Sequence, residues 1–165
     1  MMFDEFIYDV IPAPSGMTKR KAAHVAVTNE KAISDDPSNA AQISAELKTR
    51  GIKFQRWPSK PELEHEARQE QILEAYASLI ASVKEHENYQ TVDVMRVGSE
   101  RPNTSLRQTF LQEHQHAEDE VRFFVDGCGL FSLHINNEVL QVRCEANDWI
   151  TIPAGTKHWF DMGAN

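Results

Sequence analysis

Residues 113–135 read EHQHAEDEVRFFVDGCGLFSLHI and contain the pattern that decides the fold. Two short apolar runs, at 120–125 and 129–135, lie on either side of the turn signal Asp126-Gly127. Short apolar runs bounded by turn residues are typical of β-strands. A histidine pair and several carboxylates come directly before the first run. We therefore predict two strands here, with candidate metal ligands where the first strand begins.

Similar runs lie on both sides of this segment. Downstream, EVLQVR at 138–143 follows the turn signal Asn136-Asn137, and WITIPAG occupies 149–155. Upstream, TVDVMRV occupies 91–97, and residues 52–57 alternate apolar and polar side chains as a half-buried strand does. Helices followed by a string of short strands indicate an α+β, mainly β protein. Its main body is predicted to be an antiparallel barrel or sandwich.

The N-terminal half carries two apolar stripes at helical spacing. In the first, Ala40, Ile43 and Leu47 share one face. A helix-start signal at Asp36-Pro37 precedes this stripe, and Gly51 is a plausible stop. We interpret both stripes as core packing and expect two to three helices ahead of the strands. The second stripe consists of Ile72, Leu73, Tyr76, Leu79, Ile80 and Val83.

Length and charge limit the class of protein. The 165 residues suit one domain, and 17 basic against 25 acidic residues give a net charge of −8. This charge argues against nucleic acid or an anionic membrane as the main partner. No run of about 18 apolar residues is present, so no membrane span is predicted. The acidic start (Asp4, Glu5) is unlike a secretory signal, and we expect a cytoplasmic protein in which Cys128 and Cys144 are reduced core residues.

Residues 1–23 differ in character from the rest of the chain. They combine an apolar start, a Pro-Ala-Pro-Ser-Gly break and a basic cluster at 19–21. We interpret this segment as a flexible N-terminal extension, with a docking peptide as the alternative. The remaining residues, 24–165, are expected to form the single β-barrel domain.

Candidate metal ligands begin with a histidine pair. His114 and His116 are two residues apart, so both imidazoles point to the same face where the backbone is extended. A carboxylate a few residues later could return to the same ion after a turn. Spacing alone leaves Glu118 and Glu120 open for this role, because a turn after His116 resets the alternation.

A further histidine follows a bend downstream. The motif P-x-G-x-x-H at 153–158 places a proline and a glycine just before His158. Such a bend can bring His158 beside the first pair from a neighbouring strand. Three imidazoles and one carboxylate form a mixed nitrogen and oxygen set, which suits Fe(II), Ni, Mn, Co, Cu or Zn. An octahedral ion would keep two positions open for a bidentate substrate or O2 chemistry.

The other histidines are less specific signals. His24, His65 and His86 lie in polar surroundings and are interpreted as solvated side chains. His134 alternates with apolar neighbours, which is the pattern of a buried, hydrogen-bonded strand residue. We therefore keep these four histidines outside the predicted ligand set.

Two blocks of the chain carry a family resemblance. HxH-x3-E, followed after six residues by Gly127, resembles the first cupin motif, and P-x-G-x-x-H resembles the core of the second. Gln108 and Asn147 stand where cupins usually have glycine, and Met162 replaces a usual asparagine. These departures fit a narrower family, because EHQHAEDEVRFFVDGCGLFSLHI and VRCEANDWITIPAGTKHWFDMG resemble acireductone dioxygenase of the methionine salvage pathway. The resemblance runs from His24 to the end of the chain.

The resemblance implies a cupin barrel and assigns roles to residues. It selects Glu120 as the carboxylate ligand. It implies that Arg122 stabilises an anionic enediolate or oxygen-derived anion, and that Phe110 and Phe160 shape the pocket and exclude water. Core packing is the alternative for both phenylalanines. Asp119 could orient a ligand, with an exposed turn carboxylate as the alternative. The implied metal ligands are His114, His116, Glu120 and His158.

The implied reaction is the oxidation of acireductone, 1,2-dihydroxy-3-keto-5-methylthiopentene, by O2 with one Fe(II) or Ni(II) ion per chain. With Fe(II) the family forms 4-methylthio-2-oxobutanoate and formate. With Ni the family forms 3-methylthiopropanoate, formate and carbon monoxide. The family also implies a monomer, and a further strand with an arginine that we expect to be missing after Asn165.

Two alternatives stay open at this point. Another cupin dioxygenase or isomerase could share the fold and the ligands, because a fold does not specify a substrate. The second alternative is a non-catalytic metal-binding interaction module, with residues 1–23 as its docking element.

Overall fold

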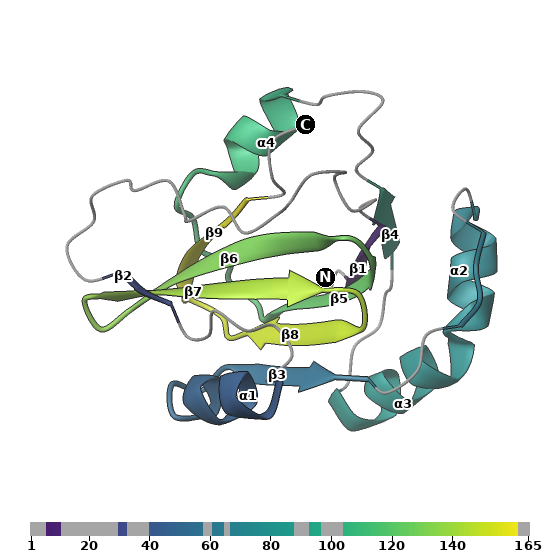
Figure 1. Ribbon diagram of the computed structural model, residues 1–165, viewed down its shortest axis with the longest axis horizontal. Coiled ribbons are helices and arrows are strands. Elements are labelled where there is room, and N and C mark those ends of the chain that lie inside the picture. Colours follow the sequence, from purple (N-terminus) through teal and green to yellow (C-terminus); the bar gives the residue numbers. More distant parts are fainter. Residues whose placement is uncertain are drawn as a thin grey trace.

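The computed structural model describes residues 6–10, 30–32, 40–57, 61–64, 67–87, 93–96 and 104–161. Its strands are β1 (Phe6–Val10), β2 (Glu30–Ala32), β3 (Lys53–Arg56), β4 (Asp93–Arg96), β5 (Glu120–Asp126), β6 (Cys128–Ile135), β7 (Glu138–Glu145), β8 (Asp148–Ile152) and β9 (Lys157–Asp161). They form one sheet of order β3-β8-β5-β1-β4 and another of order β2-β7-β6-β9. Within the described ranges the two sheets form an open sandwich (Figure 1).

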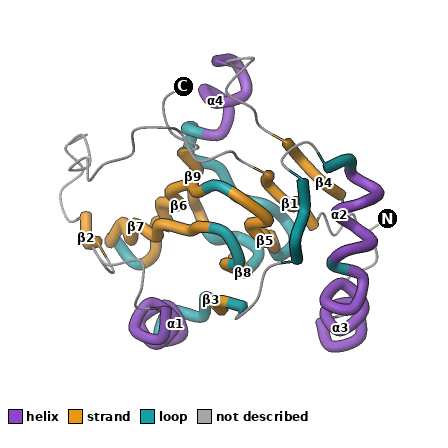
Figure 2. The backbone as a smooth tube through the Cα atoms, turned by 45° about the vertical axis from the view of Figure 1, so that its right-hand side comes forward, coloured by secondary structure: helices purple, strands orange, loops and turns teal. Residues whose placement is uncertain are grey.

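Helices surround this sandwich (Figures 1 and 2). They are α1 (Ala40–Lys48), α2 (Gln69–Ala75), α3 (Ala77–Glu87) and α4 (Thr104–Phe110). Helix α1 lies along β3, and α4 lies beside β9. No helix in the described part of the chain has the length and apolar character that crossing a membrane requires.

Alternate residues of β5 and β8 point to opposite sides of their sheet. Phe124 and Ile150 lie in the core cluster between the sheets, together with Phe131 of the facing sheet. Phe123 and Trp149 are each one position away and lie in a second cluster with residues of α2 and α3. Both faces of this sheet are therefore largely buried, because one face packs on the second sheet and the other on helices.

Turn residues connect the strands where the sequence predicted them. Asn136 and Asn137 have φ values of 50° and 65° and form the two-residue connection between β6 and β7. Two left-handed residues are what such a tight hairpin requires, and asparagine tolerates that conformation. Gly127, with φ of 75°, joins β5 to β6. The predicted mainly β fold with an antiparallel body is confirmed by the pairings among β3, β5, β6, β7, β8 and β9.

β1 lies inside the segment that we expected to be a flexible extension. It pairs in parallel with both β4 and β5, so that Tyr8 is opposite Val94 on one side and Phe123 on the other. Its sequence, FIYDV, is rich in the aromatic and β-branched residues that strands favour. The expectation therefore differs from the structure at this strand, while the other parts of 1–23 lie outside the described residues. A domain boundary after residue 23 stays a prediction.

The helices largely follow the predicted stripes. Helix α1 buries Ile43 and Leu47, and Gly51 follows it with φ of 78°, as expected of a glycine stop. The predicted start at Asp36-Pro37 lies outside the described residues. The second stripe is divided between α2 and α3, because Tyr76 leaves helical geometry with φ of −102° and ψ of 13°. Its ring is buried against β5, a contact that the helical spacing did not reveal.

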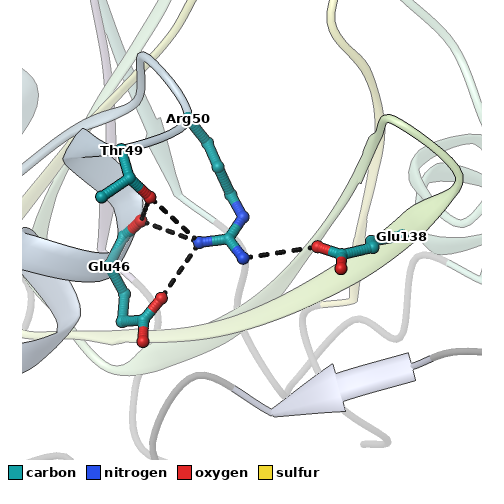
Figure 3. Close-up of polar contacts among 4 residues, drawn as sticks. All are labelled: Glu46, Thr49, Arg50 and Glu138. Atoms are coloured by element: carbon teal, nitrogen blue, oxygen red, sulfur yellow. Dashed lines mark hydrogen bonds and ion pairs between the residues drawn. The ribbon is translucent and has the colours of Figure 1, made fainter.

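Arg50 links the end of α1 to the β6–β7 hairpin (Figure 3). Its Nη1 donates to the backbone oxygen and to Oε2 of Glu46, both at 3.0 Å, and to Oγ1 of Thr49 at 3.2 Å. Its Nη2 donates to Oε2 of Glu138 at 3.3 Å. Partly exposed pairs of this kind contribute about 0–1 kcal/mol to stability. Burial of the apolar face of α1 therefore contributes more to its attachment than this contact does.

A more deeply buried ion pair joins the last residue of β3 to the first residue of β8. Asp148 is fully buried, and its two carboxylate oxygens accept from Nε and Nη2 of Arg56 at 2.7 and 2.9 Å. The same carboxylate accepts the backbone N–H of Glu145 at 2.8 Å. Burial raises the pKa of Asp148 despite these partners. The carboxylate therefore depends on Arg56 for much of its compensation.

Replacing Arg56 should destabilise the protein strongly. In Arg56→Ala the buried Asp148 loses its counter-charge, and we expect the free energy of unfolding to fall by about 3 kcal/mol. The matched control is Arg50→Ala, which removes an arginine whose carboxylate partners are 39 % and 48 % exposed, and it should cost about 1 kcal/mol or less. Urea unfolding of both variants measures the difference. Equal losses in the two variants would contradict this interpretation of the Arg56–Asp148 pair.

Candidate metal centre

Four side chains with metal-binding atoms converge where β5 begins and β9 passes beside it. His114 and His116 lie between α4 and β5, Glu120 is the first residue of β5, and His158 lies in β9. Their candidate ligand atoms all lie within 4.8 Å of one another. The centroids of the three imidazole rings are 4.5 to 5.3 Å apart. The structure therefore brings together the four residues that the resemblance implied.

Backbone hydrogen bonds hold the two histidine-bearing segments side by side. His114 and His158 exchange N–H to carbonyl bonds, both of 2.9 Å, as an isolated antiparallel bridge. The N–H of Gly155 donates to the carbonyl of His116 at 2.9 Å. Gly155 has φ of 76°, a conformation in which a side chain would be strained. The predicted bend before His158 thus places this residue against the first pair.

The orientation of two rings follows from the carbonyl groups beside them. Nδ1 of His114 lies 2.7 Å from the carbonyl oxygen of Gln112, and Nδ1 of His158 lies 2.8 Å from that of Thr156. A carbonyl oxygen only accepts hydrogen bonds, so Nδ1 carries the proton in both rings. In the neutral ring this leaves the lone pair on Nε2, which is the form that binds a metal.

Glu120 is the charged centre of the cluster. Its side chain is 9 % exposed, and Oε1 accepts a hydrogen bond from Nε of Arg122 at 2.7 Å. Its Oε2 lies 2.6 Å from Nε2 of His158 and 3.5 Å from Nε2 of His116. Burial raises the pKa of Glu120, but His158 and Arg122 outweigh burial and hold the pKa at about 2. The carboxyl group is therefore ionised at neutral pH.

The buried polar atoms of this cluster fit a cation. Oε2 of Glu120 and Nε2 of His158 are both buried, and neither makes a hydrogen bond of suitable geometry. Burial lowers the pKa of His158, but the adjacent Glu120 carboxylate outweighs it and the net shift is upward. A metal ion bound between Oε2 of Glu120 and Nε2 of His158, in place of a proton on that nitrogen, would satisfy both atoms. One carboxylate with three imidazoles is a donor set that suits divalent transition metals.

An aromatic wall lies beside this cluster. The guanidinium carbon of Arg122, a residue only 5 % exposed, is 5.5 Å from the ring centroid of Phe110 and 5.6 Å from that of Phe160. The two rings meet edge to face with centroids 6.5 Å apart. Gly129 has no Cβ, and a Cβ there would collide with the ring of Phe160. Arg122 is thus held between two aromatic rings and the carboxylate of Glu120.

Comparison with known protein families matches residues 14–165 to the ARD/ARD' family. The chain belongs to the ARD/ARD' family. This membership confirms the resemblance to acireductone dioxygenases and to the wider cupin superfamily that the two sequence blocks indicated.

Relatives of the family support the assignment. A protein named acireductone dioxygenase from Synechococcus sp. (strain CC9311) is 69 % identical over 152 residues, which cover 92 % of this chain and 74 % of that protein. One of the same name from Prochlorococcus marinus (strain MIT 9313) is 58 % identical over 132 residues, 79 % of this chain and 70 % of that protein.

A solved structure of the family also matches this fold. It is described as acireductone dioxygenase from Bacillus anthracis with a cadmium ion in its active centre. The TM-score is 0.65 at 28 % sequence identity, and the match covers 74 % of this chain and 77 % of that one. The cupin fold expected from the sequence is thereby confirmed. Together with the cluster of histidines and Glu120, this match indicates a metal-binding site in the ARD/ARD' fold.

Two acidic residues that the sequence analysis singled out lie beside the cluster. Glu118, which spacing alone left open as a ligand, is outside the group of converging atoms, whereas Glu120 is inside it. Asp119 accepts the backbone N–H of Ala154 at 2.8 Å. This bond ties the turn before β5 to the bend before His158. In this ARD/ARD' chain, Asp119 therefore contacts the backbone near the ligands.

The remaining histidines are distributed as follows. His134 lies outside the cluster, and its Nδ1 is 2.7 Å from Oε2 of Glu113. His86 lies in α3, and His24 and His65 are outside the described residues. No sequence motif indicated the roles of the carbonyls of Gln112 and Thr156. Both precede a ligand histidine by two residues, a spacing that is too common in proteins to be a signal by itself.

Proposed function

We propose that this protein is an acireductone dioxygenase that uses O2 to cleave 1,2-dihydroxy-3-keto-5-methylthiopentene in methionine salvage. The observation that carries the proposal is the convergence of three imidazoles on a buried carboxylate that also contacts Arg122. Two similar proteins bear the name acireductone dioxygenase, and this name supports acireductone as the substrate. We further propose that it acts in the cytoplasm as a monomer. Light scattering of the purified chain would check the oligomeric state.

The proposed ligands hold one Fe(II) or Ni(II) ion per chain. Nε2 of each ring and a carboxylate oxygen supply the donor atoms, listed by residue as His114, His116, Glu120 and His158. When bound, such an ion supplies Lewis-acid chelation of two neighbouring substrate oxygens. With Fe(II) we propose 4-methylthio-2-oxobutanoate and formate as products, and with Ni(II) 3-methylthiopropanoate, formate and carbon monoxide.

Arg122 is placed to stabilise negative charge that develops during this reaction. Its charge is buried, and Nε is already directed at the Glu120 carboxylate, so the guanidinium is oriented before substrate arrives. A fixed cation in a site of low polarity stabilises a developing anion more than a mobile, hydrated one does. We assign Arg122 to stabilising the enediolate. Phe110 and Phe160 pack around Arg122 and exclude water from it.

Turnover of acireductone tests this function directly. Metal-free protein is reloaded with Fe(II) or Ni(II), and O2 uptake and loss of the substrate's ultraviolet absorbance are followed. We expect turnover only in the loaded protein, with metal-free protein and free metal ions as controls. Loaded protein that consumes acireductone no faster than the free ion would overturn the proposal.

Substitution of Arg122 should lower turnover without releasing metal. Arg122→Lys keeps the charge but loses the planar fork that contacts Glu120. We expect turnover to fall by about tenfold or more, which corresponds to ~1.4 kcal/mol in the barrier. Protein loaded at saturating metal should keep its full metal content, because all four donor residues remain, while loss of the contact to Glu120 lowers the metal affinity. The matched control is Arg143→Lys on the exposed side of β7, and wild-type turnover in Arg122→Lys would show that Arg122 has only a structural role.

A further inference from the structure

Helix α4 is short and lies directly upstream of the candidate metal centre. It has 7 residues and ends at Phe110, and the chain then reaches His114. A helix of this length is not stable in water without tertiary contacts. Its position beside β9 (Figure 1) therefore depends on the groups that attach it to the sandwich.

An ion pair attaches α4 to the end of β9. Nε and Nη2 of Arg107 lie 3.1 and 3.0 Å from Oδ1 of Asp161, and Nη2 lies 3.2 Å from Oδ2. The two side chains are 36 % and 33 % exposed. Two N–H groups that face one carboxylate give a charge-assisted contact with a defined direction. Arg107 thus adds a directional contact between α4 and the strand that carries His158.

The position of α4 is transmitted to the site by two routes. Phe110, at the end of α4, contacts the ring of Phe160 and lies 5.5 Å from the guanidinium carbon of Arg122. The chain after α4 also continues in hydrogen-bonded turns, with Gln112 N–H donating to Thr109 O at 3.2 Å. The carbonyl of Gln112 is the acceptor that orients the ring of the first ligand histidine.

We propose that Arg107 and Asp161 are positioning residues that hold α4, and with it Phe110, over the substrate pocket. This inference rests on the proposed function, because Phe110 affects substrate only where acireductone occupies the space beside Arg122. Neither charged group belongs to the donor set. Loss of the pair should therefore weaken substrate binding more than it changes turnover, because His114 is also held by its backbone bonds to His158, and Arg122 by its bond to Glu120. The expected signature is a rise in KM with little change in kcat.

Charge reversal tests the pair. Arg107→Asp and Asp161→Arg each place like charges opposite one another, and the double variant restores an opposite pair. We expect each single variant to raise KM about tenfold with kcat within about twofold, and the double variant to return to within about threefold of the wild-type KM. Arg50→Asp, which reverses one charge of the Arg50–Glu138 pair (Figure 3), is the matched control and should leave KM unchanged. A double variant as impaired as the sum of the singles would overturn the proposal.

A second measurement does not depend on turnover. Hydrogen exchange of the amides of residues 104–112 should be about five- to tenfold faster in each single variant and return towards wild type in the double variant. Metal content should be the same in all forms. If wild-type protein does not turn over acireductone but exchange follows this pattern, the proposed function fails while the positioning of α4 stands. If turnover is normal and neither exchange nor KM responds, the inference about Arg107 and Asp161 is wrong.

Discussion

His116→Ala should empty the candidate metal centre. The substitution removes one of the three imidazoles. The ligand atom of each lies within 4.8 Å of the other ligand atoms of the cluster. Loss of even an outer partner of a ligand costs roughly 10–100-fold in metal affinity, so loss of a direct donor should cost about 100-fold or more. Metal analysis of purified protein and titration with Co(II) measure the effect. A turnover assay should show no activity above that of free metal.

His116 is the most informative ligand to remove, because its side chain is 48 % exposed whereas that of His158 is 2 % exposed. Its loss leaves the core intact, so the variant should unfold at the same urea concentration as the metal-free wild type. His86→Ala, in α3, is the control and should keep full metal content. Wild-type metal content in His116→Ala would rule out the proposed donor set.

Carbon monoxide should form with Ni(II) and not with Fe(II). The donor atoms are all imidazole nitrogen and carboxylate oxygen, which accept both ions. The polypeptide is the same in both forms, so a difference in products must come from the ion. Metal-free protein is divided, loaded separately with the two ions and supplied with acireductone and O2. We expect carbon monoxide and 3-methylthiopropanoate from the Ni(II) form, and 4-methylthio-2-oxobutanoate from the Fe(II) form.

The comparison requires that each preparation holds a single metal. Metal analysis before and after turnover provides this control, and metal-free protein provides the background. Identical product mixtures from two pure forms would show that this chain does not have dual chemistry. That outcome would leave the dioxygenase assignment intact, because O2 uptake by the Fe(II) or the Ni(II) form supports the assignment.

Local signals in the sequence were sufficient for most strands. An alternation of apolar and polar residues was recognisable in β3 and a short apolar run in β5, and turn residues at Asp126-Gly127 and Asn136-Asn137 marked where strands end. Asn147 is a harder case. It stands where cupins usually have glycine, and its φ of 75° shows that the position requires a left-handed residue, which asparagine tolerates.

Other features depend on contacts that local spacing does not encode. Tyr76, where the second stripe is divided, packs its ring against β5, and the place of β1 follows from its pairing with β4 and β5. The Arg107–Asp161 pair joins residues 54 positions apart. None of these could be read from a helical or strand period, because periodicity reports the direction of a side chain and not its partner.

In the candidate site, too, local spacing indicated some features and the tertiary structure decided others. Residue spacing by itself determined a histidine pair on one face, a later histidine behind a Pro-Gly bend, and a carboxylate at either of two positions, of which the family resemblance selected Glu120. Only the tertiary structure brought Glu120, and not Glu118, within reach of the imidazoles, and only it placed Arg122 between that carboxylate and two phenylalanine rings. The physical reason is that the turn before β5 sets which carboxylate faces inward. That turn is held by bonds to the distant segment 154–158, including Asp119 to Ala154 and His114 to His158.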